Sequence, residues 1–162
     1  MNPTETARLE FLRHTLATVA YRGGKVLRDA PTGFPTFRIA STSRTPGEIL
    51  AHLCDLLDWA AHLCEGQHVW KDSRPQEWKE DVSRFFRALA RLDERLCSGK
   101  QLGFPAETLF QGPFADALTH IGQIALLRRV AGAPIRGENY FRADIHAGSL
   151  GPAQPPPKVE FD

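Results

Sequence analysis

Long apolar runs are missing from this sequence of 162 residues, although 42% of its residues are hydrophobic. No stretch approaches the roughly 18 consecutive apolar residues that a membrane-spanning helix requires. The first ten residues, MNPTETARLE, also lack the basic stretch and apolar core of a secretory leader. We therefore expect a cytoplasmic protein that does not insert into a membrane.

An excess of charge of one sign is missing as well. The 20 basic and 19 acidic side chains give a formal net charge of +1, so no global field favours nucleic acid or an anionic membrane surface as a partner. The chain is long enough for one well-buried core and too short for two. We expect a single domain over residues 1–162.

Cysteine is scarce, and its spacing is not that of a metal-binding pair. The sequence has Cys54, Cys64 and Cys97 and no CxxC motif. In a chain without a leader, these residues are expected as reduced thiols packed like small hydrophobic side chains. No activating neighbour can be identified for any of them, so nucleophilic cysteine chemistry is not expected.

Strand-like alternation and internal repeats are absent, whereas helical runs separated by proline and glycine recur. We predict helices over about residues 3–29, 45–66, 76–98 and 113–131. The start of the second is marked by Thr45 as N-cap, Pro46 at the first helical position and Glu48 three residues after the cap. The fourth contains IGQIALL, which is apolar on nearly every side and belongs in the centre of a fold.

The segments between and after these helices are rich in proline and glycine. Residues 30–44 are expected to form a long ordered connection that crosses the molecule, and ENYFRADI one short turn. The tail from about residue 150, with three consecutive prolines, is expected to be extended or loose and to pack along the domain or a partner. The prediction is an all-α four-helix bundle with a long connection between its first two helices.

The segment DALTHIGQIALLRR carries the most informative polar pair. Asp116 and His120 are four residues apart, which places both side chains on one face of a helix. In a bundle, His52 from the second helix could join them, and two imidazoles with one carboxylate suit Zn, Ni, Fe or Mn with open coordination positions. Asp116 could instead favour the helix dipole, and His120 could be a hydrogen-bonded core histidine. Spacing alone leaves both interpretations open.

Two segments add a family resemblance. TPGEILAHLCDLLDWA has a histidine inside the second helix, and HIGQIALLRRVAGAP has a histidine followed by x-Gly-Gln in the fourth. This order of parts resembles the DinB/YfiT-like family of metal-dependent four-helix bundles. The resemblance implies a site of three histidines, one on the second helix and two in an HxxxH arrangement on the fourth. His52 and His120 match the first and the last of these.

Asp116 stands where the family pattern has its remaining histidine. A carboxylate can occupy the same corner and give a harder, more negative site, which is the interpretation we favour. The alternative is a scaffold that has lost a ligand and no longer holds metal.

The resemblance also implies a function. We expect a divalent-metal-dependent enzyme, most simply a thiol-dependent transferase or a hydrolase, with a small-molecule substrate such as a low-molecular-weight thiol, and a homodimer. A divalent ion would act as a Lewis acid, activating water or lowering the pKa of a bound thiol. The alternatives are a non-catalytic, stress-related protein that binds metal or a ligand, and a metal-free bundle that serves protein association.

Other polar residues have two interpretations each. Asp55 could orient an imidazole of the site, but we favour a solvated helix face for Asp55 and Asp58. Gln123 could bond near the site or to a neighbouring helix. The segment GENYFRADI could form a lid, although we favour a cap over the bundle end. The remaining histidines are expected at the surface or locally hydrogen-bonded: His14, His62, His68 and His146.

Overall fold

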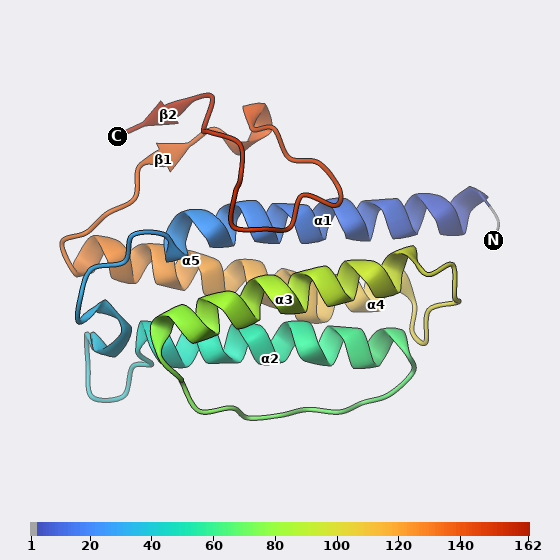
Figure 1. Cartoon of the computed structure of the whole chain (residues 1–162), viewed down its shortest axis with the longest axis horizontal. Helices are drawn as coiled ribbons and strands as arrows, with labels where there is room; N and C mark the ends of the chain where they lie inside the picture. The colour runs from blue at the N-terminus through green and yellow to red at the C-terminus, as the bar shows by residue number, and fades with distance from the viewer. Residues whose placement is uncertain (1–2) are drawn as a thin grey trace.

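Four long helices form the body of the protein in the computed structural model, which describes residues 3–162 (Figure 1). They are α1 (Pro3–Leu27), α2 (Pro46–Cys64), α3 (Trp78–Cys97) and α5 (Ala115–Val130). The shorter elements are η1 (Phe34–Thr36), α4 (Ala106–Leu109), the π turn η2 (Phe110–Phe114), β1 (Gly137–Glu138), η3 (Tyr140–Arg142) and β2 (Glu160–Phe161). The all-α prediction is confirmed. Within residues 3–162, no helix has the length and apolar character needed to cross a membrane.

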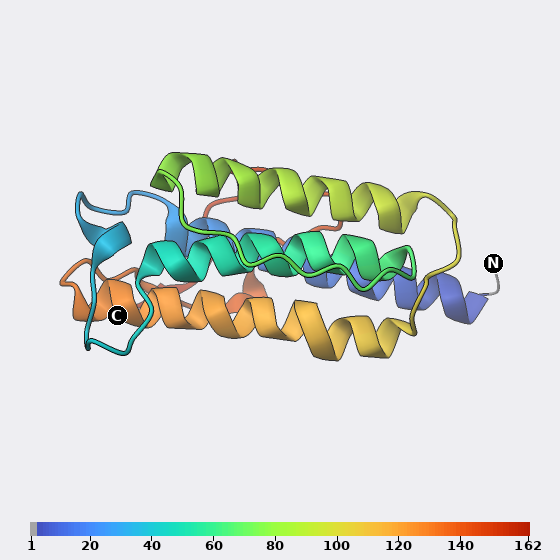
Figure 2. The ribbon, with the colours of Figure 1, turned by 90° about the horizontal axis from the view of Figure 1, so that it is seen from below.

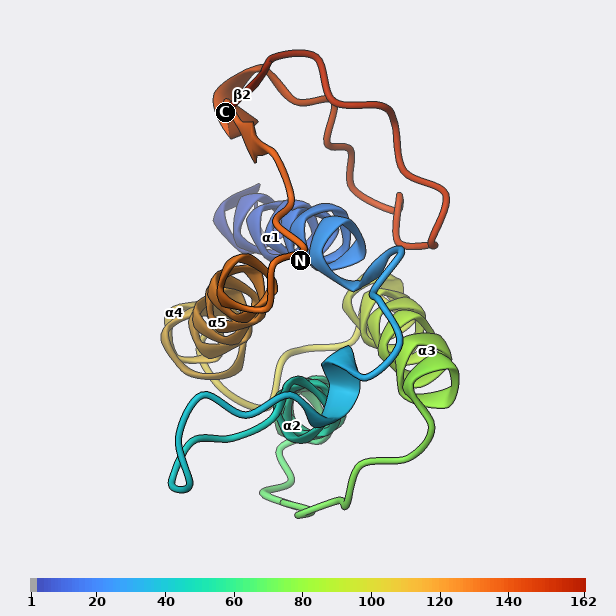
Figure 3. The same ribbon diagram turned by 90° about the vertical axis from the view of Figure 1, so that its left-hand side faces the viewer.

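The four long helices pack in a ring, seen along their axes in Figure 3. Each contacts two others, in the order α1, α3, α2, α5 and back to α1. Helices α1 and α5 run in one direction and α2 and α3 in the other (Figure 1). This places α2 and α5 side by side and antiparallel.

Two long connections join the helices, and the sequence predicted only the first of them. Residues 30–44 stay at one end, where they join the antiparallel pair α1 and α2 (Figure 1). Because α2 and α3 are parallel, the connection 65–77 must return along the whole length of α2, as Figure 2 shows. Residues 30–44 also cross the molecule, as predicted, but only at one end of the bundle, because α1 and α2 lie diagonally opposite in the ring (Figure 3).

The start of α2 forms as its sequence predicts. The backbone N–H of Glu48 donates to Oγ1 of Thr45 over 3.2 Å, and the backbone N–H of Thr45 donates to the Glu48 carboxylate over 2.6 Å. This reciprocal pair satisfies two N–H groups that the first helical turn leaves without partners. It fixes where α2 begins and hence which face carries His52.

One continuous apolar core lies between the four long helices. Its fully buried side chains include Leu16 of α1, Leu53 of α2, Phe85 of α3 and Ile124 of α5. Helices α1 and α3 approach closely at Gly23, where a Cβ atom would lie 2.5 Å from Cζ of Phe85. The glycine that weakens the helical pattern of α1 therefore makes room for the largest side chain of the core.

The fourth helical segment begins earlier than predicted. It starts at Ala106, passes through the π turn η2 and continues as α5. Pro113 lies inside η2, next to Gly112 with its non-helical φ of −84° and ψ of −106°. A proline inside a helix lacks an N–H donor and its ring displaces the preceding turn, which a widened turn accommodates. Pro113 is thus an internal residue and not the helix start.

Residues 131–162 form a C-terminal arm along α1 (Figures 1 and 3). Strand β1 pairs antiparallel with β2, with Gly137 opposite Phe161. The buried Glu138 accepts hydrogen bonds from the Tyr21 hydroxyl over 2.6 Å and from Lys25 Nζ over 2.7 Å. The short turn predicted in ENYFRADI is η3, and the extended tail returns to β1. Because GENYFRADI lies along α1, the predicted bundle-end cap is wrong, and the segment is not a lid over the α2–α5 pair.

Candidate metal centre

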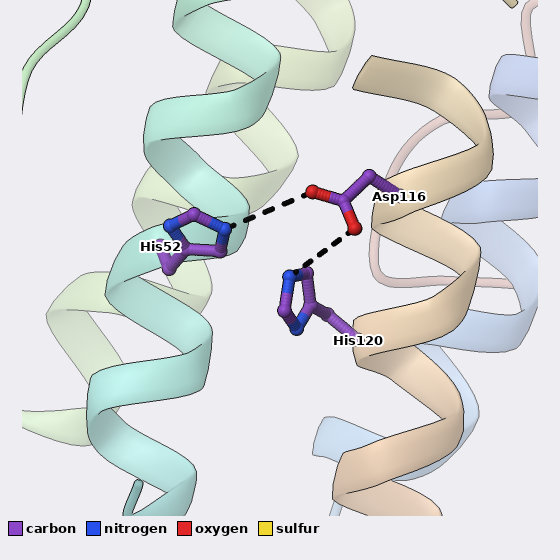
Figure 4. Close-up of side chains that lie close together, drawn as sticks. All are labelled: His52, Asp116 and His120. Atoms are coloured by element: carbon purple, nitrogen blue, oxygen red, sulfur yellow. Dashed lines mark ion pairs between the residues drawn. The ribbon is translucent and has the colours of Figure 1, made fainter. Parts of the chain in front are cut away.

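The three predicted ligands meet between α2 and α5 (Figure 4). His52 projects from α2, and Asp116 and His120 project from successive turns of α5. One ligand atom from each residue lies within 4.8 Å of the others. The three side chains therefore lie together, as the resemblance implied.

The local structure explains why these side chains converge. Asp116 lies in the first turn of α5 and His120 one turn later, so both face α2. The π turn η2 directly precedes α5 and contains one residue more than an ordinary helical turn. This extra residue changes which of the preceding residues lie on the same helix face as Asp116. On α2, the capping box fixes the helix start and so the side on which His52 emerges.

The spacing of the donor atoms is close to that of a metal site. Ligand atoms at bond lengths of about 2.0–2.1 Å in a tetrahedral site lie about 3.3 Å apart. His120 Nε2 lies 3.4 Å from Asp116 Oδ1, and His52 Nε2 lies 3.9 Å from Asp116 Oδ2. The two imidazole rings stand nearly perpendicular, with centroids 4.6 Å apart. The donor set therefore fits a divalent ion after small side-chain rotations, with coordination positions left open.

His120 is held in the tautomer that a metal ligand needs. Its Nδ1 lies 2.8 Å from Oε1 of Gln123, and this contact is a hydrogen bond when Nδ1 carries the ring proton. The lone pair of Nε2 then points toward Asp116 and His52. Of the two interpretations for Gln123, the structure places it at the site, where it orients a ligand.

His52 is kept neutral by its surroundings. Burial lowers its pKa, and the nearby His120 and Arg44 lower it further against the opposing charges of Asp116 and Asp55. The ring of Trp70 packs against it, with centroids 5.4 Å apart. A neutral imidazole at neutral pH is free to donate its lone pair to a metal.

Asp116 gives the site its access to solvent. Its side chain is 46% exposed, against 18% for His52 and 11% for His120. It faces an open groove of about 430 Å³ that also includes Trp59 and Thr119. A substrate can therefore approach the carboxylate side of the triad without displacing either histidine.

Two further grooves reach the histidines. The groove beside His52 is polar and is lined by Arg44, Glu48, His52, Asp72, Ser73, Arg74 and Pro75. The groove beside His120 is lined by Ile39, Ser43, Arg44, Ile49, His120, Gln123, Leu126 and Leu127. Arg44 lines both. Two further hollows lie between the start of α1 and the α4 region, away from the three candidate ligands.

Asp55 and Asp58 have a structural role that the sequence did not reveal. Asp55 is buried and accepts hydrogen bonds from the backbone N–H and hydroxyl of Ser73, both over 2.7 Å, and from Arg84. Asp58 binds Arg84 and Arg91. A solvated helix face is therefore the wrong interpretation, because these carboxylates fasten the connection 65–77 and α3 to α2.

The cysteines do not form a second reactive site. Cys54 and Cys64 are buried, as predicted, but Cys97 is exposed. Burial and the carboxylate of Asp93, whose Oδ2 lies 3.7 Å from its Sγ, raise the pKa of the Cys97 thiol. A raised pKa leaves little of the reactive thiolate at neutral pH.

The other histidines stay outside the metal centre. His14, His68 and His146 are exposed and His62 is half-buried, and none of them joins a metal-ligating cluster within residues 3–162. His68 packs on Trp59, which in turn contacts Trp70, so an aromatic cluster borders His52. Sequence reasoning missed Trp70 and Arg44 as neighbours of the site, because both lie in connections whose path the helical pattern does not define.

Comparisons with known proteins leave the family open. No protein family model matches the sequence, and no curated protein or solved structure is detectably similar to it.

Proposed function

We propose that this protein is a divalent-metal-dependent enzyme whose ion is held between α2 and α5 by His52, Asp116 and His120. The observation that carries the proposal is the meeting of three donor atoms from two helices within 4.8 Å of one another. The orientation of His120 by Gln123 and the neutral state of His52 support it. The proposal includes membership of the DinB/YfiT-like family, which the two quoted segments favour.

Thiol-dependent group transfer is the chemistry we favour, with hydrolysis as the alternative. A divalent ion in this site would supply Lewis acidity, lowering the pKa of a thiol or water that it binds. Asp116 is the most exposed of the three side chains, so solvent reaches the site on its side. Trp59 lines the groove at Asp116, and Trp70 packs against both Trp59 and His52. The substrate thiol supplies the nucleophile, since the chain's own thiols are buried or have a raised pKa.

A turnover assay tests this proposal. Protein loaded with Zn, Ni, Fe or Mn is mixed with a low-molecular-weight thiol and an aryl chloride, and release of chloride as the thioether forms is followed. We expect thiol-dependent turnover that is lost in His120→Ala and kept in His146→Ala, which removes an exposed histidine elsewhere. Equal rates for the wild type and His120→Ala across the metals, thiols and electrophiles would contradict the proposal.

Self-association belongs to the same proposal. The exposed side chains of Phe11 on α1 and Phe110 on η2 stack with ring centroids 5.6 Å apart beside an apolar groove. Such a patch favours a protein contact, most simply a symmetric homodimer. Light scattering after size-exclusion chromatography should give twice the chain mass for the wild type and the chain mass for Phe11→Asp; a monomeric wild type would contradict it.

A further inference from the structure

The groove beside His120 has an unusual distribution of charge. Its volume is about 370 Å³, and apart from His120 it is lined by four aliphatic side chains, Ser43, Gln123 and Arg44. Arg44 therefore contributes the one permanent charge of this lining. We call this feature the Arg44 groove.

Arg44 is available to a ligand. Its side chain is exposed and has no carboxylate partner within residues 3–162, whereas Arg38 pairs with Glu48 and Arg84 with Asp55. It also lines the groove beside His52, so it borders both grooves that reach the histidines of the site. A guanidinium in this position is within electrostatic reach of whatever occupies the metal centre.

The walls of the Arg44 groove are apolar and partly uncovered. Ile39 and Leu126 are 52% and 57% exposed on either side, while Ile49 and Leu127 are buried beneath them. Covering exposed aliphatic side chains with an apolar group is favourable. The groove thus offers an apolar surface, one cation and an adjoining metal ligand.

We propose that the substrate of this enzyme is an organic anion with an apolar body, which lies in the Arg44 groove with its acidic group on Arg44 and its reacting group at the metal centre. The proposal rests on the metal site proposed above. A guanidinium binds a carboxylate through two parallel hydrogen bonds, which a neutral amide cannot reproduce. Arg44 is accordingly the specificity residue, and Leu126 contributes affinity without discriminating charge.

Calorimetric titration of the zinc-loaded full chain tests this assignment. The ligands are 2-mercapto-3-phenylpropionate and its carboxamide, which keeps the thiol and the ring but lacks the negative charge. We expect the wild type to bind the carboxylate roughly three- to tenfold more tightly, the range of a solvent-accessible charged hydrogen-bonded pair. Arg44→Ala should remove this preference, and Arg44→Lys should keep part of it.

Two controls isolate the role of Arg44. Arg142→Ala removes another exposed arginine, from the C-terminal arm, and should keep the full preference. Leu126→Ser should weaken binding of both ligands by the same factor. If the wild type binds both alike, or if Arg44→Ala keeps the preference, Arg44 does not bind the anion and the assignment is overturned.

A second pair of ligands separates this inference from the thiol chemistry. Succinic acid monohydroxamate and its carboxamide chelate divalent metals without a thiol. A preference for the charged hydroxamate that depends on Arg44, with no binding of either thiol, would contradict thiol-dependent transfer and uphold the Arg44 groove. No preference in either pair would overturn the Arg44 groove while leaving the metal site standing.

Discussion

Asp116 is the residue on which the character of the site depends. It lies within 3.9 Å of a nitrogen of each histidine, and it is the most exposed of the three side chains. A carboxylate in place of a third imidazole reduces the net charge of a bound divalent ion and favours harder metals. The structure therefore gives Asp116 a position consistent with a ligand.

Substitutions at Asp116 should distinguish two interpretations: that Asp116 is a metal ligand, and that the site has lost a ligand and no longer holds metal. Asp116→His should still bind a divalent metal with a changed preference, because an imidazole can occupy the same corner. Asp116→Ala should weaken binding by more than about 100-fold, the upper range for losing a residue that merely supports a ligand. Competition with a chromogenic chelator measures both affinities, and unchanged affinity in Asp116→Ala would show that this corner is wrongly assigned.

The lowered pKa of His52 leads to a defined pH dependence. Because its pKa lies below the unperturbed histidine value of about 6.5, His52 should bind metal with little proton competition at pH 7, and affinity should fall only at a pH below that value. The folded chain binds this proton less readily than the unfolded chain, so the metal-free protein should also lose stability over that range.

Proton NMR of the metal-free protein checks this directly. The His52 ring resonances should titrate below the unperturbed histidine value, and Arg44→Ala should raise the pKa because it removes a nearby cation. A normal or raised pKa for His52 in the wild type would contradict the electrostatic description of the site.

Residue by residue, the sequence predicted which three side chains meet at the candidate site better than it predicted the residues around them. Asp116 and His120 could be paired from helical spacing, and His52 from the resemblance. Asp55 could not be assigned, because its partners Ser73 and Arg84 come from a connection and from another helix. The same holds for Trp70, which reaches His52 through the path of residues 65–77.

At the scale of elements, helix ends were predicted well where a local signal marks them. The capping box at Thr45 set the start of α2, and Gly132, with a φ of 75°, follows the end of α5. The helix start was wrongly predicted at Pro113, because proline is common at the first helical position. Here Pro113 lies within a π turn. The choice depends on packing, which the local pattern does not contain.

The two adjacent glycines of α1 provide a matched test of helix packing. Gly23→Ala should destabilise the protein by about 1–2 kcal/mol, because the added Cβ would lie 2.5 Å from Phe85 and overpacking outweighs the better helix propensity. Gly24→Ala should stabilise it by up to about 1 kcal/mol, since its Cβ would meet Phe86 at 3.6 Å. Urea denaturation measures both, and equal effects would contradict the close approach of α1 and α3.

At the scale of the molecule, topology was the least predictable feature. A long connection can close one end of a bundle or return along its length, and composition does not distinguish the two. Residues 30–44 do the first and residues 65–77 the second, because Asp55 and Arg84 hold the latter against α2 and α3. The pairing of β1 with β2 escaped prediction because each strand is two residues long.

The packing of the C-terminal arm should have little effect on metal binding. Glu138→Gln should loosen the arm, because it removes the negative charge that binds Lys25. Burial lowers the pKa of Lys25, but Glu138 and Glu160 together outweigh this effect and raise it. Hydrogen exchange in residues 131–162 should then rise while metal affinity stays within about twofold, since the arm lies along α1 and the site between α2 and α5 (Figure 3). A large loss of metal affinity would show that the arm supports the site.

The central claim is that α2 and α5 hold a metal ion, and elemental analysis of protein purified without a polyhistidine tag tests it most directly. We predict close to one divalent ion per chain for the wild type and for the control His146→Ala, and little for His120→Ala, with circular dichroism confirming that all three are folded. Equal metal content in the wild type and His120→Ala would contradict the claim.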